Sequence, residues 1–164
     1  MCVVDIEYKI QYTRGNIVHN FLFNNDTKEW FLSEKQAKAC VEPYLSKIPE
    51  SLLIAFKNEG WKITITNENL EKRYGYDFEI YGVTDREDKH IYVYSYEDAI
   101  KYGLGHEIGH FVDIYLGNVS FTRDWKDIAM KHKKTNIPPV YFGTGEGENP
   151  KDEYFADCFF AILK

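Results

Sequence analysis

The chain has 164 residues, of which 44% are hydrophobic and 28% charged, a composition typical of one soluble globular domain with its own core. Its net charge of −6 argues against nucleic-acid binding, which needs a basic surface. The three cysteines, Cys2, Cys40 and Cys158, are widely spaced and include no C-x-x-C pair, which argues against a disulfide framework and against a cysteine zinc site.

Neither a membrane span nor a signal peptide is evident in the sequence. No apolar run approaches the roughly 20 residues that cross a bilayer. Asp5, Glu7 and Lys9 stand where a signal peptide would need an apolar segment. We therefore expect a cytoplasmic protein with no membrane partner. Export by another route, or origin as a domain of a longer secreted protein, stays open.

The first half of the chain predicts strands and short helices. Arg14-Gly15-Asn16 is typical of a hairpin turn between two alternating segments. Ser33 and Gln36 have the spacing of a capping box, which predicts the start of a helix. In chain order, the expected elements are strands at 3–12 and 17–23, helices at 33–45 and 50–59, a strand at 61–66 and a short helical turn at 69–74.

The second half predicts two strands and then helices. Ser95 is expected to cap a long helix that stops at Gly117-Asn118, residue types that favour the left-handed backbone of a helix end. The expected elements are strands at 78–83 and 90–95, helices at 95–116 and 122–133, a loop at 135–149 and a last helix at 149–164. This order predicts an α+β fold with a small mixed sheet and an edge strand just before the long helix.

The long helix contains His106-Glu107-Ile108-Gly109-His110, which has the H-E-x-x-H form that binds zinc on a helix. Residues four apart share one helical face, so the imidazoles of His106 and His110 can both reach one zinc ion. Glu107 stands beside the metal, where it can take a proton from zinc-bound water as general base. Gly109 leaves space in mid-helix for another backbone to approach closely.

A catalytic zinc site with two histidines needs a third protein ligand and an open position for water. The last predicted helix offers Glu153 and Asp157, whose carboxylates project from one face because they are four residues apart. Glu153 suits the third ligand, and Asp157 suits the outer partner that accepts the free N–H of a ligand histidine. Asp113 and His132 stay open as alternative third ligands.

Residues 105–113 (Gly-His-Glu-Ile-Gly-His-Phe-Val-Asp) and 153–159 (Glu-Tyr-Phe-Ala-Asp-Cys-Phe) resemble the two motifs of glutamate-ligand zincins of the lethal-factor type. This family of zinc metallopeptidases includes the catalytic domain of anthrax lethal factor and the bacterial Pro-Pro endopeptidases. The resemblance covers residues 78–164 at motif level. It implies a zincin-like fold with His106, His110 and Glu153 as zinc ligands, Glu107 as general base, and Asp157 bound to His106.

The same resemblance implies a tyrosine upstream of the third ligand that hydrogen-bonds the oxyanion. Tyr141 is its natural counterpart, with Tyr154 as a second candidate. The expected protein is thus a zinc endopeptidase acting on a protein or peptide substrate. We expect a single domain, with N-terminal strands and helices over 1–75 and the catalytic core over 76–164.

The strand at 90–95 is the expected substrate site, because a peptide can add to an edge strand through backbone hydrogen bonds. Tyr92 and Tyr94 are its candidate contacts. The alternative that this strand is merely a sheet edge stays open. Two other functions also stay open: a cytoplasmic metallopeptidase that cleaves a repressor protein, and a zinc-stabilised pseudopeptidase that cleaves nothing.

Overall fold

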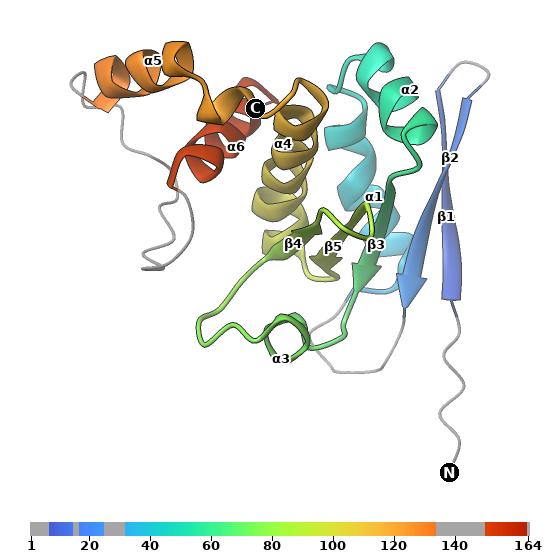
Figure 1. The fold of residues 1–164 in the computed structure, drawn as a ribbon. Helices are drawn as coiled ribbons and strands as arrows, with labels where there is room; N and C mark the ends of the chain where they lie inside the picture. Colours follow the sequence, from blue (N-terminus) through green and yellow to red (C-terminus); the bar gives the residue numbers. More distant parts are fainter. Residues whose placement is uncertain (1–6, 15–16, 25–31, 134–149, 164) are drawn as a thin grey trace. The chain divides into compact units, whose positions relative to one another are not determined.

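The structure is a computed structural model that describes residues 7–14, 17–24, 32–133 and 150–163 (Figure 1). By its internal contacts the chain forms two compact units, an N-terminal unit over residues 1–104 and a C-terminal unit over residues 105–164. Strands and helices both contribute, which confirms the α+β class. Within the described ranges, no helix combines the length and the apolar character needed to cross a membrane.

A five-stranded mixed sheet lies in the N-terminal unit, with its strands in the order β1-β2-β3-β5-β4 (Figure 1). Neighbouring β2, β3 and β5 run parallel, whereas β1 pairs antiparallel with β2 and β4 pairs antiparallel with β5. The strands are β1 (Glu7–Arg14), β2 (Ile17–Asn24), β3 (Lys62–Thr66), β4 (Gly82–Asp85) and β5 (His90–Tyr94).

Helices α1 (Glu34–Leu45) and α2 (Glu50–Asn58) form the crossover between the parallel strands β2 and β3, and α3 (Leu70–Tyr74) follows β3. The start of α1 confirms the predicted capping box: the Ser33 hydroxyl accepts from the Gln36 backbone N–H, and the Gln36 side chain accepts from the Ser33 backbone N–H. This exchange satisfies two backbone donors that a helix start otherwise leaves unpaired.

One face of the sheet is an apolar core. Ile63 pairs with Ile91, and Ile65 with Val93, and these four side chains are at most 3% exposed. Because alternate side chains of a strand point to opposite faces, the same register puts polar and aromatic residues of β3 and β5 on the other face. Burial of the apolar face is the main stabilising contribution to this unit.

The expectation that residues 90–95 form an edge strand is wrong. Strand β5 lies between β3 and β4 and is paired on both sides, so its backbone cannot receive a peptide strand. At this end of the described sheet, β4 is the outer strand. The side chains of Tyr92 and Tyr94 are also occupied: Arg73 donates to the Tyr92 hydroxyl at 3.1 Å, and the Leu70 backbone N–H donates to the Tyr94 hydroxyl at 2.7 Å.

The strand expected at 78–83 begins later, at Gly82, and continues to Asp85. The Asp85 carboxylate accepts from the backbone N–H groups of Glu87 and Asp88, at 3.1 and 3.0 Å. These bonds tighten the turn, so that pairing with β5 extends as far as Asp85 opposite His90.

Ser95 does not cap the next helix as expected. Its hydroxyl is buried and has no hydrogen-bond partner among the described residues. A π-helical turn, η1 (Ala99–Gly103), comes instead before α4 (Leu104–Tyr115). Gly103 in this turn lies against Tyr81, because a Cβ at Gly103 would be 2.9 Å from the Tyr81 Cβ. Single π turns inserted in helices are frequent near functional sites.

The C-terminal unit consists of α4, the short 3-10 helix η2 (Val119–Phe121), α5 (Arg123–Lys133) and α6 (Pro150–Leu163). Helix α4 ends as predicted, with Gly117 and Asn118 in the left-handed region at φ of 85° and 59°. Trp125 of α5 packs edge-on against Phe155 of α6, with ring centroids 4.9 Å apart. This unit contains both sequence motifs.

Candidate metal site

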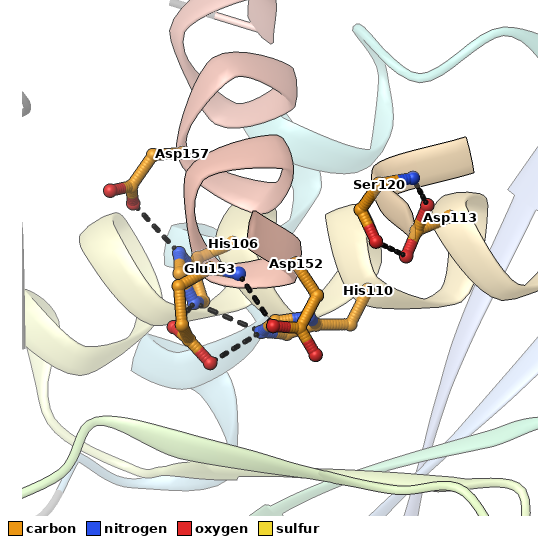
Figure 2. A network of polar contacts seen from close by, with 7 residues as sticks. All are labelled: His106, His110, Asp113, Ser120, Asp152, Glu153 and Asp157. Carbon is orange, nitrogen blue, oxygen red and sulfur yellow. Dashed lines mark hydrogen bonds and ion pairs between the residues drawn. The ribbon is translucent and has the colours of Figure 1, made fainter. Parts of the chain in front are cut away.

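The two histidines of α4 lie one helical turn apart and turn their Nε2 atoms toward each other (Figure 2). The two Nε2 atoms of His106 and His110 are 3.1 Å apart, and the rings are nearly perpendicular. Both side chains are largely buried. The four-residue spacing on one helix is sufficient to produce this arrangement.

A glycine brings the second helix close enough to complete the site. A Cβ placed on Gly109 of α4 would be only 2.7 Å from the Cα atom of Ala156 in α6, and 3.0 Å from its carbonyl oxygen. No side chain fits at this crossing, which confirms that Gly109 allows a close backbone approach. Since Ala156 lies between Glu153 and Asp157 in α6, the same crossing sets the position of both carboxylates.

Glu153 reaches both histidines from α6 (Figure 2). Its Oε2 lies 3.0 Å from Nε2 of His106, and its Oε1 lies 3.4 Å from Nε2 of His110. The three residues form a group that could hold a metal ion, with their ligand atoms all within 4.8 Å of one another. Half of the Glu153 side chain is exposed, so solvent reaches the group from this side.

The other proposed third ligands differ in their surroundings. Asp113 of α4 is fully buried, and both its carboxylate oxygens accept hydrogen bonds from Ser120. His132 lies in α5, but its side chain is outside the described part of the chain. Among the described residues, Glu153 is therefore the carboxylate that the fold brings to the histidine pair.

Asp157 lies on the far side of His106 from Glu153 (Figure 2). Its Oδ1 is 2.9 Å from Nδ1 of His106, so an Nδ1–H can donate to the buried carboxylate. Such a bond leaves Nε2 of His106 with a lone pair directed at the centre of the group. This pairing of an outer carboxylate with a ligand histidine is what metal-binding imidazoles commonly show.

The donor set could hold one metal ion. With Nε2 of His106 as an acceptor, lone pairs from two imidazoles and one carboxylate converge on a single point, and they repel unless a cation lies between them. Atoms bonded to one tetrahedral zinc at about 2.0–2.1 Å lie about 3.3 Å apart. The two Nε2 atoms are 3.1 Å apart, Oε2 of Glu153 is 3.0 Å from Nε2 of His106, and its other oxygen, Oε1, is 3.4 Å from Nε2 of His110, so each of these separations is close to this spacing.

The raised pKa of His106 shows that its surroundings favour a positive charge at this position. Burial is the largest single influence and lowers this pKa, but hydrogen bonds to Asp157 and Glu153, together with the charge of Glu107, raise it to about 10. Without a metal, a proton on His106 therefore supplies the missing positive charge. A metal ion bound here would displace that proton.

The other predicted site residues are Glu107, Tyr141 and Tyr154. Glu107 lies in α4 between the histidines in sequence and is 7% exposed. Tyr141 falls in 134–149, outside the described residues. Tyr154 lies in α6, where its ring centroid is 6.0 Å from that of Trp125. The structure thus brings together His106, His110, Glu153 and Asp157.

Two features of the site were not predicted from the sequence. Gly105, one turn before Gly109, faces α6 as well: a Cβ there would be 2.7 Å from the ring of Phe160. The four-residue spacing of the two glycines was the available signal. The bonds between Asp113 and Ser120 were also missed, because a short-range pattern does not show that a loop turns back on its helix.

Comparisons with known proteins identify no relative: no family model matches the sequence, and no curated protein or solved structure matches it significantly. The case for a function therefore rests on the chemistry of the site.

Proposed function

We propose that this protein is a zinc-dependent endopeptidase of the glutamate-ligand zincin type. The observation that carries the proposal is the convergence of His106, His110 and Glu153, with Asp157 behind His106. Two imidazoles and one carboxylate are the ligand set of such catalytic zinc sites, and structural zinc sites commonly use four protein ligands instead. The H-E-x-x-H order around Glu107 supplies the other element that this chemistry needs.

The ligand types favour zinc over harder ions. Imidazole nitrogen suits zinc, whereas magnesium and calcium prefer oxygen ligands throughout. His106, His110 and Glu153 would hold the ion, and the exposed half of the Glu153 side chain would give solvent access to it. When bound, zinc acts as a Lewis acid and lowers the pKa of coordinated water to about 7.

Glu107 is the residue that would move protons. It directly follows His106 in the motif and is only 7% exposed, so little bulk solvent surrounds its carboxylate. As general base it removes a proton from the attacking water, and it then delivers that proton to the amine of the departing peptide. Asp157 keeps His106 in the required tautomer throughout, because it accepts from Nδ1.

A peptide-library digestion tests the proposal. Protein loaded with zinc should cleave a set of peptides at internal bonds, with products identified by mass spectrometry. The same protein treated with a chelator should leave the library intact, and added zinc should restore cleavage. Zinc binding at the three ligands without any cleavage would identify a pseudopeptidase instead and would reject the enzymatic function.

A further inference from the structure

Asp113 is a buried acid that the proposed chemistry does not use. It lies in the last turn of α4, three residues after His110, and none of its surface is exposed. Its Oδ1 accepts from the backbone N–H of Ser120 at 2.7 Å, and its Oδ2 accepts from the Ser120 hydroxyl, also at 2.7 Å (Figure 2). Both oxygens of one carboxylate are therefore directed at one residue.

This position is unfavourable for an acid. The C-terminal end of a helix carries partial negative charge, which repels a carboxylate in the last turn. Removal from water adds a further penalty that only close partners offset. The two hydrogen bonds from Ser120 offset part of both costs, and removing them would leave a buried carboxylate without these partners.

The bonds fix the chain where it leaves α4. Asn118 adopts a left-handed conformation, and its backbone N–H donates to the carbonyl oxygen of Asp113 at 2.8 Å. Ser120 then lies inside η2, so the Asp113 side chain and backbone together hold the short helix against the end of α4. We call the Asp113 and Ser120 pair the clasp.

The clasp is connected to the metal site through packing. Helix η2 packs against α6, the helix that supplies Glu153 and Asp157. One side of α6 is therefore fixed at the crossing between Gly109 and Ala156, and another part rests on η2. A helix held at two places keeps its side chains in a defined position, as a metal site requires.

We propose that Asp113 and Ser120 are positioning residues that set α6 for metal binding. This inference rests on the proposed metal site, although not on peptidase activity. The clasp acts through η2 on α6 and brings the carboxylate of Glu153 within bonding distance of the two imidazoles. Loss of the clasp lets α6 shift, and the metal then loses its third ligand before the fold is lost.

The test compares zinc affinity with stability in four variants. Asp113→Ala removes the clasp, whereas Asp113→Asn keeps its shape, because the amide oxygen still accepts from the Ser120 N–H and the amide nitrogen can donate to its hydroxyl. Ser120→Ala removes one of the two bonds. Ile65→Ala, which opens a cavity in the sheet of the other unit, serves as a destabilised control. Each folded variant is titrated with zinc against a chromophoric chelator, and with Co²⁺ for its visible spectrum.

We expect Asp113→Ala to weaken zinc binding about 10- to 100-fold and to change the Co²⁺ spectrum, as loss of groups that orient metal ligands does. Asp113→Asn should restore most of the affinity, Ser120→Ala should fall between, and Ile65→Ala should bind zinc normally despite its lower melting temperature. A purely structural clasp would lower melting temperatures and leave affinity and spectrum unchanged.

Folded Asp113→Ala with the affinity and the Co²⁺ spectrum of the unaltered chain would overturn the inference. Should Asp113→Ala fail to fold, Ser120→Ala decides: unchanged affinity and spectrum in that variant overturn the inference, and weakened binding supports it. An unaltered chain that binds no zinc would instead overturn the proposed metal site, which separates the two failures.

Discussion

Glu107→Gln is expected to abolish most peptide cleavage while the protein keeps its zinc. The amide is nearly the same size as the carboxylate but cannot accept a proton from water, and general acid–base catalysis contributes about 10²–10⁴-fold to rate. The ligand atoms of His106, His110 and Glu153 are not altered by this change. Initial rates on a cleaved library peptide, with zinc content measured on the same samples, give the comparison.

The control for this variant is its metal content and fold. Zinc should remain close to one ion per chain, and the circular dichroism spectrum should match that of the unaltered protein. A Glu107→Gln protein that cleaves at the original rate would remove Glu107 from the mechanism. A variant that loses both activity and zinc would mean that Glu107 supports the metal site instead of the proton transfer.

Gly109→Ala is expected to cost most of the zinc affinity by displacing α6. The new Cβ would lie 2.7 Å from the Ala156 Cα, and a backbone atom cannot move aside as the end of a side chain can. Overpacking of this kind costs about 1–3 kcal/mol, which exceeds the gain of about 1 kcal/mol that alanine brings to a helix. A shift of α6 moves Glu153 from the histidines, so zinc affinity should fall at least about tenfold. Isothermal titration with zinc measures this effect.

Gly105→Ala provides the matched control on the same helix. It carries the same gain in helix propensity, but its Cβ would meet the ring of Phe160, a side chain that can rotate. We therefore expect a smaller loss of affinity than at Gly109. Equal and unchanged zinc affinity in both variants would show that the close crossing does not determine the site.

The helical part of the site could be predicted because its information is local. The four-residue spacings of His106 and His110, and of Glu153 and Asp157, each put two side chains on one helical face. Which residue joins the two histidines as third ligand does not depend on local sequence, and Asp113 and His132 stayed open for that reason. The crossing at Gly109 brings Glu153 of α6, and not Asp113 of α4, to the histidine pair, whereas the side chain of His132 lies outside the described residues.

The order of the strands in the sheet could not be predicted from local sequence patterns. The segment before the long helix was expected at the sheet edge, whereas β5 lies between β3 and β4. The sequence did contain a signal, because the four successive residues Ile91 to Tyr94 are apolar or aromatic, as is typical of a strand with both faces covered. The structure shows all four of them buried. Pairing partners depend on distant segments, so the sequence alone did not show that β4 would cover the edge.

The start of the long helix was also not predictable from local sequence. Ser95 has the residue type of a helix cap, but the chain forms the π turn η1 before α4, and the Ser95 hydroxyl is buried in the sheet unit. Capping preferences describe an isolated helix end, and they yield to packing where the chain leaves a buried strand.

The most direct test of the zinc site is a crystal structure of the zinc-loaded protein with anomalous scattering measured at the zinc edge. We predict one zinc ion bonded at about 2.0–2.1 Å to Nε2 of His106, Nε2 of His110 and a carboxylate oxygen of Glu153, with a solvent molecule as its remaining ligand. Zinc bound elsewhere, or held by the two histidines with Glu153 turned away and another protein group in its place, would contradict the proposed site.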